Sequence, residues 1–360
     1  MEFKISNFNI MSDKHFDFYS WNEVNVEPED SRNARYDQMI AVINQINRRE
    51  KIDVMTFQEV TEHSIEKLKK YAESKKYKLY ENQIKSVDRP ILLATMIKDD
   101  LVNAQTNNII DLTDNYQNFY NKNNYHSTQD DYFSGRAQVF YIISKNLIVV
   151  NVHAPGLPDG FVQELWYKNL AAFLRCGCMT NQDISDNCYP KNQNLKIILI
   201  GDFNVSVPEK IIEWTNENNK LPRLELFNDI PDRRNTSYHS GIKSRDNIWM
   251  PDPEPYQKVD HLIHTLNLET PELYVYVSNN LIDRQIIPYK RIPPLDMYAG
   301  PGMAAPGNGY WESNYDINQG GWPSDHTFNL YVFSDIQDEI MLGGAYNSKK
   351  NKTRKYRIIY

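Results

Sequence analysis

Runs of apolar residues alternate along this chain with stretches in which apolar residues recur every three or four positions. The apolar runs at 53–57, 147–152 and 195–200 predict short strands that are buried on both faces. The wider spacing predicts helices at 32–50, about 62–75, about 161–175 and near 208–218, with Ser31 capping the first. Alternating strands and helices are typical of a layered α/β domain.

Other segments complete this outline. Further strands are expected at 3–10, 77–82, 91–97, 136–143, 224–228, 259–263 and 328–333. Residues 107–131, rich in Asn, Asp and Tyr, predict a long surface excursion, and residues 286–323, rich in Pro and Gly, predict an ordered loop. Ser348 to Arg357 hold six basic residues in ten. We therefore expect one domain over residues 1–335 and a mobile basic tail over 336–360.

Composition narrows the function classes. The 360 residues are 41% hydrophobic and carry a net charge of −7, so no overall positive field would drive a coating of nucleic acid. An enzyme that uses a metal and local cations remains compatible with this charge. The sequence shows no signal-peptide pattern and no apolar run long enough for a membrane span, which favours an intracellular protein, cytoplasmic or nuclear. Three sparse cysteines are expected to be reduced thiols.

The apolar run that begins at Leu195 ends in Gly201-Asp202-Phe203-Asn204. In an extended chain, residues i and i+2 project to the same side, so Asp202 and Asn204 would face one point at the end of a core strand. A simple Asp-Asn turn would also explain this pair. The functional interpretation therefore depends on the other strand ends.

Several other predicted strand ends carry polar groups. Each has an ordinary explanation when taken alone, such as a helix cap, a packed loop histidine or a turn. Together they offer hard oxygen ligands for a divalent cation, imidazoles and an amide. This set suits displacement at phosphorus, because a cation neutralises phosphate charge and side-chain donors hold the non-bridging oxygens. These residues are Asn9, Glu59, His153, Asp260, Asp325 and His326.

The motifs at these positions are N-I, F-Q-E, N-V-H-A-P, G-D-F-N, V-D-H-L and W-P-S-D-H, in that order between residues 3 and 333. In this, the chain resembles the endonuclease/exonuclease/phosphatase superfamily of metal-dependent phosphoesterases, which includes the pancreatic-type deoxyribonucleases. The resemblance implies an α/β fold: a four-layer α/β/β/α sandwich of two packed mixed β-sheets flanked by helices.

The resemblance also implies a metal site for Mg²⁺ or Mn²⁺. Glu59 would be the principal ligand, with Asn9 and Asp325 beside the ion. Some DNA-repair members carry an acid two residues after the first Asn, whereas this chain has Met11. One metal ligand is therefore missing, and a single dominant ion is expected.

The remaining motif residues would act on the phosphate. By the resemblance, Asp202 orients or activates the attacking water, and Asn204 holds the phosphate. His153 would donate to a phosphate oxygen. His326 would do the same or act as the base, and Asp260 would orient its ring.

These expectations predict a Mg²⁺-dependent phosphoesterase that hydrolyses phosphodiester bonds, as a nuclease or a DNA-end-processing phosphodiesterase. The alternatives are an inositol-polyphosphate phosphatase or a sphingomyelinase-like phosphodiesterase, and a binding scaffold without activity. Nucleic acid is the expected partner, and a small phosphorylated substrate is the other option. Aromatic rings stack on bases, so the predicted substrate contacts are Tyr125, Tyr310 and Trp311, together with Arg136.

Overall fold

The structure is a computed structural model of the chain. The residues that it describes are 2–10, 12, 29–84, 91–102, 108–123, 135–155, 160–176, 195–204, 211–213, 224–226, 237–238, 241–243, 249–251, 256–257, 260–265, 268–269, 271–276, 324, 326, 328–336 and 357–359. No helix among them is long and apolar enough to cross a membrane.

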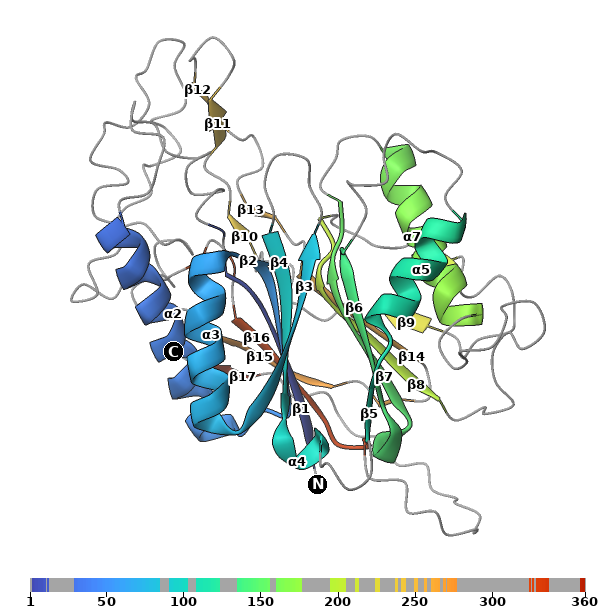
Figure 1. The fold of residues 1–360 in the computed structure, drawn as a ribbon, viewed down its shortest axis with the longest axis horizontal. Coiled ribbons are helices and arrows are strands. Elements are labelled where there is room, and N and C mark those ends of the chain that lie inside the picture. Colours follow the sequence, from blue (N-terminus) through green and yellow to red (C-terminus); the bar gives the residue numbers. More distant parts are fainter. Residues whose placement is uncertain are drawn as a thin grey trace.

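Two large β-sheets form the centre of the molecule (Figure 1). The first sheet has the strand order β17-β15-β16-β1-β2-β4-β3 and the second has β5-β6-β7-β8-β14-β9. Each sheet contains both parallel and antiparallel pairs; β1 is parallel to β2 and antiparallel to β16, and β8 is parallel to β7 and antiparallel to β14.

The strands of the first sheet are β1 (Phe3–Asn9), β2 (Val54–Val60), β3 (Tyr77–Ile84), β4 (Ile91–Lys98), β15 (Glu272–Tyr276), β16 (Phe328–Phe333) and β17 (Arg357–Ile359). Those of the second are β5 (Ile109–Asp111), β6 (Ala137–Ile142), β7 (Leu147–His153), β8 (Lys196–Asp202), β9 (Leu224–Leu226) and β14 (Asp260–Thr265). Two short ribbons pair β10 (Ser237–Tyr238) with β13 (Tyr256–Gln257) and β11 (Gly241–Lys243) with β12 (Trp249–Pro251).

Helices cover the outer faces of both sheets (Figure 1). Helices α2 (Glu29–Glu50) and α3 (Glu62–Lys75) share a hydrophobic core with the first sheet, and α5 (Thr113–Asn123) and α7 (Gly160–Cys176) share one with the second. A third core lies between the sheets. Short helices α4 (Asp99–Val102) and η1 (Ile143–Lys145) complete the described elements. The fold is therefore the predicted four-layer α/β/β/α sandwich.

The layer between the sheets changes character along its strands. On β1, Phe3 and Ile5 belong to the core between the sheets, and the alternation of a strand puts Asn7 and Asn9 on the same side. Strands β7 and β8 follow the same plan: apolar residues occupy this layer at one end and polar residues follow at the other. One end of the layer is thus an apolar core and the other is a buried polar cluster.

Two sequence predictions need correction. Helix α2 begins at Glu29, so Ser31 lies inside the helix and does not cap it. The excursion predicted over 107–131 contains β5 and α5, and Tyr116 of α5 is buried with its ring edge against Phe173 at 5.2 Å between centroids. The periodic apolar residues of this segment pack it onto the second sheet, which its Asn- and Asp-rich composition obscured.

Residues at the end of the predicted basic tail form a strand, and the boundary of the domain at 335 stays a prediction. Residues 357–359 form β17, which pairs in parallel with β15. Isoleucine favours strands, so the pair Ile358-Ile359 suits this edge position. The loop predicted over 286–323 lies outside the described residues.

Candidate active site

The polar end of the layer between the sheets brings together most of the predicted site residues. They come from five strands of two sheets, from the turn after β8 and from the segment before β16. The residues that meet there are Asn9, Glu59, His153, Asp202, Asn204, Asp260 and His326.

Glu59 reaches the site because β2 is irregular at this residue. Its φ of 58° lies in the left-handed region, and the pairing of β2 with β4 shifts between Phe57 and Val60. Strict alternation would have sent Glu59 to the helix side, where Phe57 packs. Glu59 Oε1 accepts a hydrogen bond from Asn9 Nδ2 at 3.0 Å, and Oε2 accepts one from the Ser12 amide at 3.0 Å. A non-glycine residue held in this conformation is typical of functional sites.

Asp202 ends β8 beside a glycine that no other residue could replace without strain. Gly201 has φ 148°, and a Cβ there would lie 2.0 Å from the Val152 carbonyl oxygen on β7. Asp202 Oδ2 accepts from Asn9 Nδ2 at 3.0 Å, so one amide group links Asp202 and Glu59. The close approach of β7 and β8 sets Asp202 beside the end of β7.

The chain turns immediately after Asp202 and does not continue extended to Asn204. The Asn204 amide donates to Asp202 Oδ1 at 2.8 Å, and Asn204 has φ 51°. Its side-chain Nδ2 donates to the Ala154 carbonyl at 2.7 Å. This is the turn that Asp and Asn commonly form, and it corrects the extended geometry predicted for this pair. The phosphate role of Asn204 stays a prediction.

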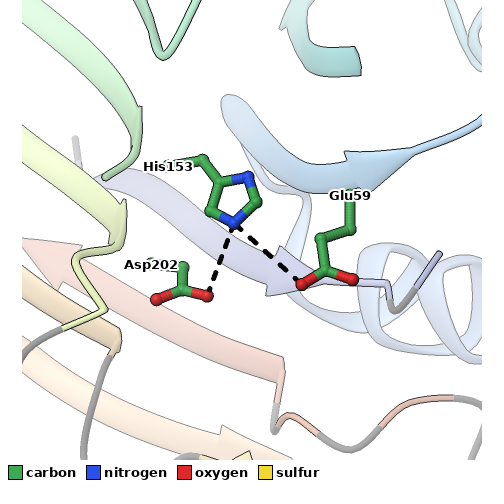
Figure 2. Close-up of side chains that lie close together, drawn as sticks. All are labelled: Glu59, His153 and Asp202. Atoms are coloured by element: carbon green, nitrogen blue, oxygen red, sulfur yellow. Dashed lines mark ion pairs between the residues drawn. The ribbon is translucent and has the colours of Figure 1, made fainter. Parts of the chain in front are cut away.

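His153 ends β7 and faces both acids (Figure 2). Its Nε2 lies 4.0 Å from Glu59 Oε1 and 3.9 Å from Asp202 Oδ2. These distances are too long for direct hydrogen bonds. One ligand atom from each of the three residues lies within 4.8 Å of the others, so the three surround one point.

His326 approaches Asp202 from another side. Its Nδ1 lies 2.7 Å from Asp260 Oδ2, and its Nε2 lies 4.0 Å from Asp202 Oδ2. Because a carboxylate only accepts, the ring donates its Nδ1 hydrogen to Asp260 and turns Nε2 toward Asp202. The Ser324 hydroxyl accepts from the His326 amide at 3.1 Å and donates to the Asn9 carbonyl at 2.6 Å, which ties this segment to β1.

Burial dominates the electrostatics of this cluster. Burial raises the pKa of Asp202 to about 7; His326 opposes that rise, and the negative charges of Asp260 and Glu59 add to it. Buried carboxylates this close to one another favour a proton or a cation in their midst. Two carboxylates and an imidazole around one point therefore fit a divalent cation, and their chemistry alone does not choose which one.

Three of the predicted metal ligands have different outcomes. Glu59 lies in the cluster described above. Asn9 directs its amide nitrogen, not its oxygen, to both acids, so ligation by Asn9 would need the opposite orientation of the amide. Asp325 lies outside the described residues. The metal roles of Asn9 and Asp325 stay predictions.

The predicted substrate contacts are mostly beyond the described part of the chain. Tyr125, Tyr310 and Trp311 lie outside it. Arg136 is buried, and its Nη1 donates to the carbonyls of His153 and Ala154 at 3.3 and 3.4 Å. Arg136 therefore braces the end of β7, and its contact with substrate stays a prediction.

Helix α7 contacts the backbone just after His153 and just before Asn204. Gln163 Nε2 donates to the Pro155 carbonyl at 2.8 Å, and the Tyr167 hydroxyl donates to the Phe203 carbonyl at 2.8 Å. These contacts fix the backbone on both sides of the cluster.

A buried amide network lies beneath the cluster and was missed from the sequence. Gln58 Nε2 of the first sheet donates to Asn151 Oδ1 of the second at 2.7 Å. Asn151 Nδ2 lies 3.1 Å from both Thr95 Oγ1 and Gln138 Oε1. The detectable signal was polar residues at i and i+2 within apolar strands, as in Asn151 and His153.

Two mixed sheets lie face to face with helices outside them, which is the architecture that the resemblance implies. No protein-family model matches the chain, and no curated protein sequence matches it.

Solved structures similar to this chain include D. rerio TDP2 complexed with a single strand DNA product, at TM-score 0.47 and 13% identity over 92% of this chain and 99% of that one. The endonuclease/exonuclease/phosphatase protein of Bacteroides vulgatus matches at TM-score 0.44 and 14% identity, over 93% and 99%. ANGEL2, a 2′,3′-cyclic phosphatase in complex with adenosine-2′,3′-vanadate, matches at TM-score 0.48 and 14% identity, over 92% and 95%. Likeness at this level decides neither activity nor substrate.

Proposed function

We propose that this chain is a metal-dependent phosphoesterase that uses Mg²⁺ or Mn²⁺ to hydrolyse phosphodiester bonds in nucleic acid, as a nuclease or a DNA-end-processing phosphodiesterase. One observation carries the proposal. Asp202 Oδ2 lies about equally far from His153 Nε2 and His326 Nε2, at 3.9 and 4.0 Å, inside a buried cluster that also holds Glu59.

The spacing around Asp202 suits a substrate. Gaps near 4 Å are too long for hydrogen bonds between the side chains, but a phosphate oxygen or a water can bridge groups at this separation. His153 ends β7 of the second sheet and His326 precedes β16 of the first, so the two rings can hold different oxygens of one phosphate. Such placed donors stabilise the charge that develops in the transition state.

Glu59 and Asp202 would hold the cation, with His153 beside it. When bound, the cation supplies charge neutralisation of the phosphate and of the leaving oxygen. The cluster without it carries two buried acids at one point, which explains why a cation belongs to the functional state.

The hydrolysis itself needs a group that accepts a proton near neutral pH. His326, whose Nδ1 donates to Asp260 and whose Nε2 lies 4.0 Å from Asp202 Oδ2, is placed for this role. A water oxygen bonds to phosphorus, the ester P–O bond breaks, and the proton of the water passes to His326 Nε2. Asp202 orients that water.

A substrate panel tests this proposal. Protein treated with EDTA is assayed with and without added Mg²⁺ on duplex DNA, single-stranded DNA, RNA, abasic DNA, 5′-tyrosyl ends, 2′,3′-cyclic phosphates, inositol phosphates and sphingomyelin. The panel includes the compound classes found with two of the similar proteins, a single strand DNA product with D. rerio TDP2 and an adenosine-2′,3′ compound with ANGEL2.

The expected result is hydrolysis of a nucleic acid only with added metal, and its loss in Glu59→Gln. Glu62→Gln is the matched control, because Glu62 is exposed on α3 three residues away. Hydrolysis of inositol phosphates or sphingomyelin alone would replace the nucleic-acid substrate with the alternative. Full activity in EDTA would reject the metal, and no hydrolysis of any substrate would favour a binding scaffold.

A further inference from the structure

Asp260 also accepts a hydrogen bond from a residue outside the superfamily motifs. Asn7 lies on β1, two residues before Asn9 and on the same side of the strand. Its Nδ2 donates to Asp260 Oδ1 at 2.9 Å, while Asp260 Oδ2 accepts from His326 Nδ1 at 2.7 Å. Asn7 and Asp260 are each 1% exposed, so bulk solvent does not reach this carboxylate.

The orientation of the Asn7 amide follows from its neighbours. Its Oδ1 lies 3.1 Å from the Thr56 hydroxyl, which can donate, and its Nδ2 faces a carboxylate, which cannot. The opposite orientation would set an amide oxygen against a carboxylate oxygen. Thr56 is fully buried on β2, and its single hydroxyl hydrogen is shared between Asn7 Oδ1 and the Ser6 carbonyl, 3.0 Å away. The Asp260 carboxylate, which only accepts, is therefore what fixes the orientation of the Asn7 amide.

We propose that Asn7 is a positioning residue for the reaction: by occupying Asp260 Oδ1, it confines the His326 Nδ1 hydrogen to Oδ2 and so aims His326 Nε2 at Asp202. A carboxylate with one oxygen held in this way cannot rotate freely to meet the imidazole differently. β1 thereby organises both halves of the site, through Asn9 on Glu59 and Asp202 and through Asn7 on Asp260. This inference rests on the proposed function.

The test is a double-mutant cycle in the full chain with Mg²⁺ and the best substrate of the panel. Asn7→Ala should lower kcat by about 10-fold to 100-fold with KM unchanged, as loss of an outer hydrogen-bond partner does. In a His326→Ala background it should cause no further loss, because Asn7 acts through that ring. Asn7→Ser keeps a short donor and should retain more activity than Asn7→Ala.

Ser6→Ala is the matched control. Ser6 neighbours Asn7 on β1, is equally buried, and its hydroxyl has no hydrogen-bond partner among the described residues. Its kcat should equal that of the wild type. An equal loss from Asn7→Ala in both backgrounds would overturn the proposal, since the effect would then not pass through His326. If Asn7→Ala does not fold, Asn7→Ser carries the same cycle.

A second readout does not need activity. In metal-free protein labelled with ¹⁵N-histidine, the His326 ring should show a protonated Nδ1 in the wild type and in Ser6→Ala. Asn7→Ala should weaken or redistribute that signal. An unchanged signal would overturn the proposal even if the protein hydrolyses nothing, whereas an absence of metal-dependent hydrolysis in the wild type would count against the proposed function alone.

Discussion

The two ends of the layer between the sheets are built from the same strands, but one end is an apolar core and the other is a cluster of buried polar groups. On β8, Ile198 and Ile200 belong to the apolar core, and Asp202 follows on the same side of the strand. On β1, Phe3 and Ile5 are followed in the same way by Asn7 and Asn9. Both ends are buried, so burial alone does not identify the site.

The difference lies in what burial costs at each end. Burial of apolar side chains stabilises the folded state by about 25 cal/mol per Å² of apolar area removed from water. Carboxylates lose hydration and need partners, and Asp202 shows this loss as a pKa raised to about 7. The apolar end therefore stabilises the sandwich, and the polar end uses part of that stability to hold reactive groups out of bulk water.

The largest expected effect on stability comes from the apolar end. Ile198→Ala removes a fully buried side chain and should lower the free energy of unfolding by about 2–5 kcal/mol. The folded fraction should keep its kcat, because Ile198 lies four residues from Asp202 and contacts no reacting group. Urea unfolding measures the free energy of unfolding, and kinetics at urea concentrations below the transition measure kcat. A loss of kcat without a loss of stability would contradict the assignment of stability to the apolar end.

The largest expected effect on activity comes from the polar end. His153→Ala and His326→Ala should each lower kcat by about 100-fold or more, as loss of one transition-state donor does. Because both rings face Asp202, the double variant should lose much less than the product of the two single losses. Steady-state kinetics decides this, and near-normal turnover of His326→Ala would remove its role.

Asp202 sharpens the comparison, because the same residue should limit stability and support activity. Its pKa rises from an ordinary value of 3.8 to about 7 on folding. The folded state therefore binds the proton of the Asp202 carboxyl more tightly than the unfolded state does. The protonated carboxyl contributes fully to the free energy of unfolding below pH 3.8, and this contribution is lost as the pH rises through about 7. The loss follows a slope of at most about 1.4 kcal/mol per pH unit.

Asp202→Asn should remove this loss. In metal-free protein, the variant and the wild type should have similar stability at pH 4, and the variant should be the more stable at pH 8, with activity abolished. Asp114→Asn is the control, since Asp114 is exposed in the first turn of α5. Thermal unfolding at the two pH values measures the difference in stability between the variant and the wild type. A variant less stable than the wild type at pH 8 would show that the ionised Asp202 carboxylate does not destabilise the folded state.

The sequence predicted the large elements of the fold because their patterns are strong. Helix α3 and strand β7 occur where the periodicity and the apolar run indicated them. The segment 107–131 was misjudged, because a polar composition hid the apolar positions that bury Tyr116. The two sheets also draw strands from distant parts of the chain, as β16 beside β1 shows, and local patterns carry no information on such pairing.

The site was less predictable than the fold. The described motif residues lie close together, but Glu59 reaches them only through a backbone irregularity, with φ 58°, that no periodicity reveals. Asn204 turns back onto Asp202 through a local hydrogen bond, where an extended strand was expected. No local pattern indicates Asn7, because its hydrogen-bond partner Asp260 is 253 residues away in the sequence.

The central claim is that the polar end holds a divalent cation between Glu59, Asp202 and His153. The most direct measurement is a titration of metal-free protein with Mn²⁺ followed by electron paramagnetic resonance. One dominant ion should bind per chain, its affinity should fall sharply in Glu59→Gln, and Glu62→Gln should bind as the wild type does. Absence of a bound ion in the wild type, or equal binding by Glu59→Gln, would contradict the account.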